Sequence, residues 1–146
     1  MSPRTSPNAP TTRTILLVED ESSVRQVTRY VLESAGYLVL EANGPEQAIR
    51  LFHRFEGAID LILTDIVMPN MNGSELVSHL RQIDPGFITV FMSGYAKGSG
   101  LSQQSFGPPD RYIQKPFSTS GLLALVADAL STAPARESGT EIRVLV

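Results

Sequence analysis

Five short apolar runs alternate with helix-like segments along the middle of this chain, and this alternation constrains the fold more than any other feature. The runs are rich in Val, Ile or Leu and are bounded by turn residues, which is typical of buried strands. They cover residues 15–18, 38–40, 61–64, 88–92 and 111–114. Strands that are apolar on both faces and alternate with helices form a parallel sheet covered on both sides. The sequence therefore predicts an α/β fold, a doubly wound five-stranded parallel sheet.

Helical patterns fill most of the gaps between these runs. Apolar side chains recur every three or four positions in four segments, which places them on one face of each helix. These segments are residues 21–35, 45–55, 74–83 and 119–131. Pro45 suits a first helical turn, and Gly36 suits the left-handed residue that ends a helix. The connector 94–110 contains four glycines and two prolines, so it predicts at most a short, weak helix.

The two ends differ in composition from this regular middle. Residues 1–13 carry three prolines among Ser and Thr, and we expect a disordered N-terminal tail there. We expect one domain over residues 14–131, and a C-terminal tail or linker over 132–146. No apolar run reaches the length that crosses a bilayer, and the net charge of -3 argues against direct nucleic-acid binding. The chain has no cysteine, which excludes thiol chemistry and suits a cytoplasmic protein.

Polar side chains follow the predicted strands at their carboxyl ends, where a doubly wound sheet binds its ligand. The first strand is followed by Glu19 and Asp20, the third by Asp65, the fourth by Ser93 and the fifth by Lys115. Taken singly, each is explained by a solvated loop, and Asp20 can simply cap the helix that follows. Together they place three carboxylates, a hydroxyl and an ammonium at one edge of the sheet.

Such a cluster indicates a bound cation and an incoming anion. Crowded carboxylates repel one another unless a cation holds them together. Oxygen ligands select Mg²⁺ or Mn²⁺, since His53 and His79 lie in helical patterns away from the strand ends. The ammonium and the hydroxyl can bind the oxygens of a phosphoryl group, for which Asp65 is a nucleophile.

Four motifs, in this order, resemble a known family. "LLVEDE", "LILTDIVMPNMNG", "FMSGYA" and "YIQKPF" resemble the receiver domain of two-component response regulators. The resemblance implies a flavodoxin-like receiver fold with strand order 2-1-3-4-5. It also implies a signalling module that is no enzyme in the metabolic sense, because it catalyses only its own phosphorylation and dephosphorylation. Its partner is then a histidine kinase or a histidine phosphotransfer domain, and its downstream protein target is left open.

Matched position by position, the resemblance makes Asp65 the phosphoacceptor of a phosphorelay. It implies a Mg²⁺ site formed by Asp20 as a direct ligand, Glu19 acting through water, Asp65, and the main-chain carbonyl of Val67.

The resemblance also assigns the residues that bind and sense the phosphoryl group. Lys115 pairs with the phosphoryl oxygens, Ser93 supplies the switch hydroxyl, and Tyr112 is the aromatic whose rotamer follows phosphorylation. The bond between Lys115 and Pro116 is expected to be cis. Tyr95 departs from the usual pattern because it is bulky and uncharged.

Other readings of the sequence stay open. The chain is a single-domain regulator, or the receiver of a larger protein such as a hybrid histidine kinase. The motif "MSGYA" and the glycine-rich connector favour a hybrid-type receiver. A receiver-like interaction module without phosphorylation is a further alternative. A Mg²⁺-dependent phosphohydrolase with an aspartyl-phosphate intermediate is a remote one, because such enzymes carry an Asp-x-Asp nucleophile pattern after the first strand, where this chain has "VEDES".

Overall fold

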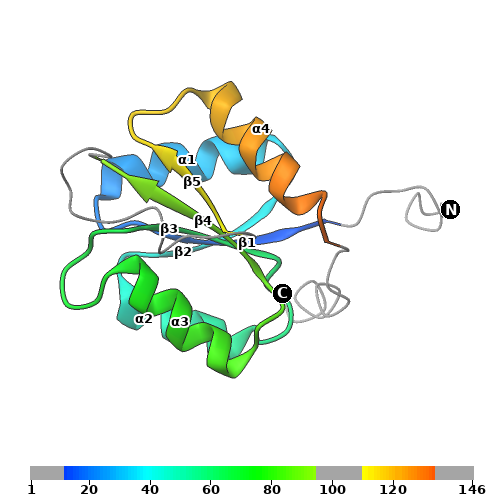
Figure 1. The fold of residues 1–146 in the computed structure, drawn as a ribbon. Coiled ribbons are helices and arrows are strands. Elements are labelled where there is room, and N and C mark those ends of the chain that lie inside the picture. The colour runs from blue at the N-terminus through cyan, green and yellow to red at the C-terminus, as the bar shows by residue number, and fades with distance from the viewer. Residues whose placement is uncertain (1–11, 95–109, 134–146) are drawn as a thin grey trace, which may run out of the picture.

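Five parallel strands form one sheet in the computed structural model of this chain, which describes residues 12–94 and 110–133 (Figure 1). The strands are β1 (Thr14–Val18), β2 (Leu38–Ala42), β3 (Leu61–Asp65), β4 (Ile88–Ser93) and β5 (Arg111–Gln114). Their order across the sheet is β2-β1-β3-β4-β5. The predicted strand order is confirmed, and each observed strand extends the predicted run by two residues at most.

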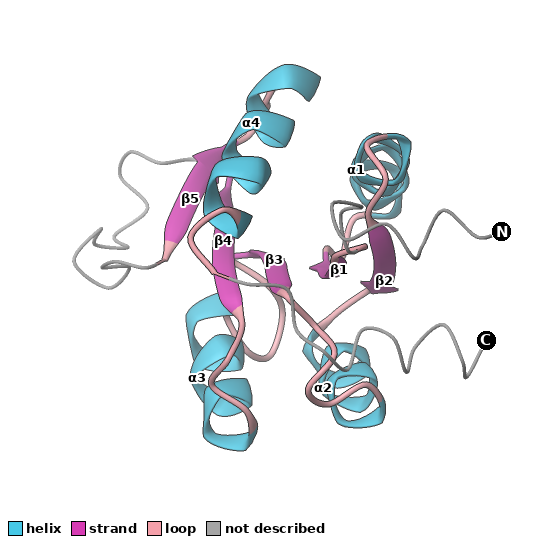
Figure 2. Cartoon of the chain, turned by 90° about the vertical axis from the view of Figure 1, so that its right-hand side faces the viewer, coloured by secondary structure: helices cyan, strands magenta, loops and turns pink. Residues whose placement is uncertain are grey.

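Within the described residues, four helices cover the sheet, two on each face. They are α1 (Ser22–Ser34), α2 (Pro45–Arg54), α3 (Gly73–Ile83) and α4 (Thr119–Leu130). Figure 2 shows α1 and α4 above the sheet and α2 and α3 below it, the layering of a doubly wound fold. The predicted weak helix in the glycine-rich connector falls on residues 95–109, outside the described residues.

The core has two halves because successive side chains of a buried strand point to opposite faces. Leu16 of β1 and Ile62 of β3 pack with Phe52 of α2 on one face. Their sequence neighbours Ile15 and Leu61 pack with helices α1 and α4 on the other. Each fully buried Leu or Ile contributes roughly 1.5–3 kcal/mol. The sheet is thus a rigid base for the loops at its carboxyl ends.

Helix ends follow local rules in most places. Gly36 has φ +98°, the left-handed conformation predicted for it. Asn72 caps α3 by accepting a hydrogen bond from the Glu75 amide. The N-cap of α1 is Glu21, without a side-chain hydrogen bond. The simple explanation of Asp20 as a helix cap is therefore wrong, because the helix begins one residue too late for it.

At the amino ends of the strands, hydrogen bonds tie the beginning of the described domain to its end. The buried Asp60 accepts a hydrogen bond of 2.7 Å from the Thr14 amide. Arg13 donates to the main-chain carbonyls of Leu130 and Ala133. Contacts of the folded domain therefore run from Arg13 to Ala133. None of the helices in the described ranges combines the length and the apolar character needed to span a bilayer.

Candidate functional site

The residues predicted to form a site come together at the carboxyl edge of the sheet. Glu19 and Asp20 follow β1, Asp65 ends β3, Ser93 ends β4 and Lys115 follows β5. β1 and β3 are neighbours in the sheet, as are β3 and β4, and β4 and β5. Glu19, Asp65 and Ser93 are buried, with exposed fractions of 1%, 4% and 7%. Polar residues therefore stand at the ends of four adjacent strands on the same side of the sheet.

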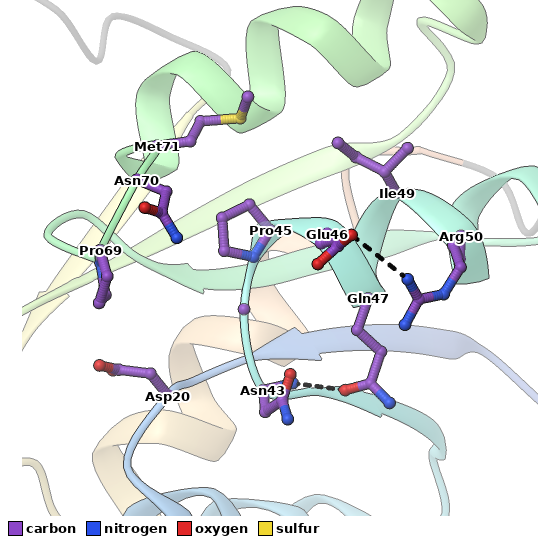
Figure 3. A pocket seen from close by; sticks show the side chains of 11 residues that line it. Asp20, Asn43, Pro45, Glu46, Gln47, Ile49, Arg50, Pro69, Asn70 and Met71 are labelled. Carbon is purple, nitrogen blue, oxygen red and sulfur yellow. Dashed lines mark hydrogen bonds and ion pairs between the residues drawn. The ribbon is translucent and has the colours of Figure 1, made fainter.

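Asp20 is the solvent-facing member of this group. It is exposed and lies at one edge of a pocket of about 740 Å³ (Figure 3). The start of α2 and the loops after β1, β2 and β3 form this pocket, with Pro45, Asn43 and Asn70 among its lining residues. The site is therefore open on the Asp20 side, while the Glu19 side is closed by the fold.

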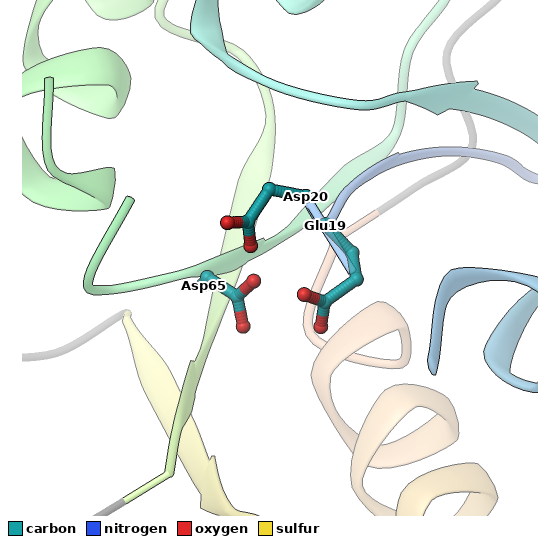
Figure 4. Close-up of side chains that lie close together, drawn as sticks. All are labelled: Glu19, Asp20 and Asp65. Atoms are coloured by element: carbon teal, nitrogen blue, oxygen red, sulfur yellow. The ribbon is translucent and has the colours of Figure 1, made fainter. Parts of the chain in front are cut away.

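Three carboxylates form the centre of the site. One carboxylate oxygen each from Glu19, Asp20 and Asp65 lies within 4.8 Å of the other two (Figure 4). Two of these carboxylates are buried, so water screens their repulsion poorly. The arrangement is electrostatically unfavourable unless protons or cations neutralise it.

Lys115 supplies one of the neutralising charges. Its Nζ donates a hydrogen bond of 2.8 Å to Glu19 Oε1 and lies 2.7 Å from Asp65 Oδ1. The second contact is an ion pair, and among the described residues the buried Asp65 Oδ1 has no well-aligned hydrogen-bond donor. The Lys115 amide donates to the Ser93 carbonyl at 2.7 Å, which fixes the lysine beside the end of β4. The Lys115–Pro116 peptide bond is cis, as predicted.

The protonation states of the buried carboxylates differ. Burial, with the neighbouring Glu19 carboxylate, raises the pKa of Asp65 to about 8, although Lys115 acts in the opposite direction. Burial alone would raise the pKa of Glu19 too. Hydrogen bonds with Asp65, Lys115 and the Glu21 amide outweigh that effect and leave the pKa of Glu19 lowered. For Lys115, contacts with the two carboxylates outweigh burial and raise its pKa. Without a bound cation, Asp65 thus keeps its proton to higher pH than an ordinary aspartate does.

This donor set fits a hard divalent cation. Its ligands are oxygens, and Asp65 Oδ1 is a buried oxygen with room in its hydrogen-bonding capacity. A divalent ion beside Asp65 would favour the charged carboxylate and so lower its pKa. Val67 follows Asp65 by two residues in the loop after β3, with a largely exposed side chain.

The loop after β3 is held against the end of that strand by a close backbone contact. The Gly73 amide donates to the Ile66 carbonyl at 2.7 Å. A Cβ atom added to Gly73 would lie 2.0 Å from the carbonyl oxygen of Asp65. Only glycine lets α3 begin this close to Asp65.

Two residues predicted from the sequence, Tyr112 and Tyr95, remain to be located in the structure. Tyr112 is half-buried on β5 and packs against the core half that α2 and α3 cover. Tyr95 lies outside the described residues. Sequence reasoning missed Arg25, whose Nη1 donates a hydrogen bond of 2.8 Å to the main-chain carbonyl of Glu19. No local pattern marks an arginine on a helix as a contact of the preceding loop.

The family model and similar curated proteins point to the same family. The model of the response regulator receiver domain matches residues 15–127. The response regulator receiver protein CpdR of Brucella abortus (strain 2308) is 38% identical over 104 residues, which are 70% of this chain and 84% of CpdR. The sensor kinase CckA of the same organism is 35% identical over 117 residues. That match covers 80% of this chain but only 12% of CckA.

Solved structures agree in fold. The receiver domain of the hybrid histidine kinase CckA superposes with a TM-score of 0.68 at 32% identity, covering 80% of this chain and 98% of that domain. A response regulator receiver protein from Sinorhizobium medicae WSM419 superposes with a TM-score of 0.72 at 31% identity. The match covers 82% of this chain and 95% of the other.

Proposed function

This chain belongs to the response regulator receiver domain family, and on that premise we propose that it accepts a phosphoryl group on Asp65 from a phosphohistidine, with Mg²⁺ as the cofactor. The donor is a histidine kinase or a histidine phosphotransfer domain, and we place the exchange in the cytoplasm. Receiver domains are signalling modules, so the product of the reaction is the modified protein itself.

The observation that carries this proposal is the buried Asp65 Oδ1 at the tip of β3. It lies 2.7 Å from the Lys115 ammonium and beside two more carboxylates, and it has no well-aligned hydrogen-bond donor among the described residues. A carboxylate oxygen held in this way is free to form a bond to phosphorus. The unusual placement of a carboxylate at the end of a wholly buried strand thus has a chemical use.

The transfer step uses residues of this chain. An oxygen of Asp65 attacks phosphorus, the P–N bond to the imidazole of the donor breaks, and its electron pair stays on the imidazole. The Lys115 ammonium balances negative charge on the phosphoryl oxygens, and the Ser93 hydroxyl donates a hydrogen bond to one of them. Mg²⁺, held by Glu19, Asp20, Asp65 and the Val67 carbonyl, would offset the negative charge of carboxylates and phosphoryl group.

The conformational change should start at Lys115 and Ser93. Phosphorylation removes the carboxylate charge with which Lys115 pairs, and it places new anionic oxygens beside both residues. Their main chains are joined by the hydrogen bond from the Lys115 amide to the Ser93 carbonyl. A shift at the site therefore acts on the ends of β4 and β5. Tyr112 stands on β5 three residues before Lys115 and would report this shift through its rotamer.

A groove beside Lys115 offers a surface for the protein that donates the phosphoryl group. It lies between α1 and the loop after β5, and its apolar lining includes Val24, Val27 and Phe117. Val27 is 65% exposed and Tyr30 is 74% exposed on the same helix. Val27→Asp should slow transfer from a phosphohistidine protein but not from a small phosphodonor. Equal slowing of both reactions would show that the groove is no docking surface.

Intact mass measurement tests the proposed function directly. Incubation with Mg²⁺ and a small phosphoramidate should add the mass of one phosphoryl group to the wild type and none to Asp65→Asn. Label retained by the variant, and mapped to another residue, would contradict the assignment. A wild type that never gains mass would favour the receiver-like interaction module instead. Continuous release of phosphate from a phosphomonoester would favour the phosphohydrolase.

A second candidate is the receiver of a hybrid histidine kinase. The similarity to the receiver of CckA favours it, since that domain is part of a much longer chain. Both candidates use the same site chemistry and differ in what the rest of the protein does. The sequence of the full-length gene distinguishes them.

A further inference from the structure

We propose that Arg25 is a positioning residue, which sets the geometry of the two metal-binding residues Glu19 and Asp20. The inference rests on the proposed function, because it concerns the Mg²⁺ site of the receiver. It assigns a role to a side chain outside the acidic cluster itself.

Arg25 joins three elements through its guanidinium. It lies in the first turn of α1, and its side chain is 17% exposed. Its Nη1 donates a hydrogen bond of 2.8 Å to the main-chain carbonyl of Glu19, and its Nε donates one of 3.0 Å to Glu41 Oε1. Glu41 belongs to the edge strand β2. The loop after β1 is therefore fastened to both a helix and a strand.

The carbonyl that Arg25 holds is the one that links the two carboxylate residues. It belongs to the peptide group between Glu19 and Asp20, so its orientation influences where both side chains point. The other side of Glu19 is held by a hydrogen bond of 3.1 Å from its amide to the Ala42 carbonyl. Arg25 and β2 thus fix the main chain of Glu19 from both directions.

Asp20 depends on this backbone more than Glu19 does. The Glu19 carboxylate accepts hydrogen bonds from Lys115 Nζ and from the Glu21 amide. Among the described residues, no hydrogen bond or ion pair holds the exposed Asp20 carboxylate. Its direction towards the cluster is therefore set mainly by the peptide that Arg25 fixes.

Arg29 provides a matched control on the same helix. It forms ion pairs with Glu41 Oε2 and with Glu33, and within the described part of the chain it has no hydrogen bond or ion pair with Glu19. Removing Arg29 takes away the same charge and a bond to the same carboxylate. It leaves the hydrogen bond to the Glu19 carbonyl in place.

The two possible roles of Arg25 predict opposite changes in Mg²⁺ affinity when the side chain is removed. If the guanidinium acted only through its charge, its removal would relieve repulsion of Mg²⁺ and tighten binding. If it positions the carboxylates, its removal loosens binding, because residues that orient metal ligands typically contribute roughly 10- to 100-fold in metal affinity. We expect a loss of about tenfold for Arg25→Ala. The Mg²⁺ affinity of Arg25→Lys should lie between those of this variant and the wild type. Lysine keeps the charge but cannot form both hydrogen bonds, to the Glu19 carbonyl and to Glu41, at once.

Calorimetric titration with MgCl₂ alone, without any phosphodonor, tests the inference on the full chain. The series is wild type, Arg25→Ala, Arg25→Lys and Arg29→Ala, with melting temperatures in chelator as a check of folding. Arg29→Ala should bind Mg²⁺ as tightly as the wild type or slightly more tightly. Glu41→Ala serves as a second route, since it removes the acceptor of Arg25 Nε and should weaken Mg²⁺ binding less than Arg25→Ala does.

Several results would overturn the inference. Unchanged or tighter binding by Arg25→Ala would do so, and so would equal weakening by Arg29→Ala. Unfolding of both Arg25 variants would assign the residue to folding instead of positioning. If the wild type itself fails to bind Mg²⁺, the metal part of the proposed function is wrong and the inference falls with it. Wild-type binding with an unaffected Arg25→Ala refutes the inference alone.

Discussion

Replacing Asp65 by asparagine should remove a pH dependence of stability that the metal-free protein has between about pH 5 and 8. The pKa of Asp65 is raised to about 8 in the folded chain by burial and by the Glu19 carboxylate. In the unfolded chain the same carboxyl titrates at its ordinary value of 3.8. Asparagine keeps the shape of the side chain and carries no titratable group.

The sign follows from counting protons. Below pH 3.8 the carboxyl is protonated in both states, and its contribution to stability is fully present. Between that value and about pH 8 the folded state keeps a proton that the unfolded state has lost, so the free energy of unfolding falls as pH rises. Glu19 and Lys115 do not change their protonation in this pH window. The pKa of Glu19 is lowered below 4.5, and that of Lys115 is raised above 10.5.

The size of the effect is measurable. The slope within the window is about 1.4 kcal/mol per pH unit. It flattens as the pH approaches the folded pKa. Between about pH 5.5 and 7.5 the wild type should therefore lose about 2 kcal/mol relative to Asp65→Asn.

Urea denaturation of both proteins in chelator at these two pH values measures the difference. The variant corrects for every other group that titrates, and Asp20, Glu19 and Lys115 are common to both chains. Excess Mg²⁺ should abolish the loss in the wild type, because the cation favours the charged carboxylate. Parallel pH profiles of wild type and variant in chelator would refute the account of a buried, protonated Asp65.

Three further outcomes are expected. Gly73→Ala should destabilise the protein by about 1–3 kcal/mol, because its methyl group would overlap the carbonyl oxygen of Asp65. Gly44→Ala is the control, since a Cβ there meets nothing within 4 Å, and equal unfolding free energies of the two variants would contradict the close contact. Combined Glu19→Ala and Asp20→Ala should remove the stabilisation by Mg²⁺, about 2.7 kcal/mol at a hundred times the dissociation constant; a melting shift as large as in the wild type would count against the site. Lys115→Ala should slow the gain of phosphoryl mass, since it removes the ammonium that balances the phosphoryl oxygens, and an unchanged initial rate would show that the lysine has no such role.

Sequence alone determined the elements of the fold and the members of the cluster. The strands are apolar throughout and short, and such runs predict buried strands without knowledge of their partners. The rule that ligands bind at the carboxyl ends of strands then selected Glu19, Asp20, Asp65, Ser93 and Lys115. Both inferences depend on periodicity and on chain order, which are properties of local segments.

Tertiary structure decided how these residues act on one another. The hydrogen bond between Lys115 and Glu19 joins residues 96 positions apart, and the raised pKa of Asp65 follows from burial and from the neighbouring Glu19 carboxylate. Gly73 is required because the start of α3 approaches the Asp65 carbonyl, a contact that depends on how the loop packs. Arg25 reaches the Glu19 carbonyl only because α1 folds back beside β1 and β2. Periodicity carries no information about such distances, since they are set by packing between segments.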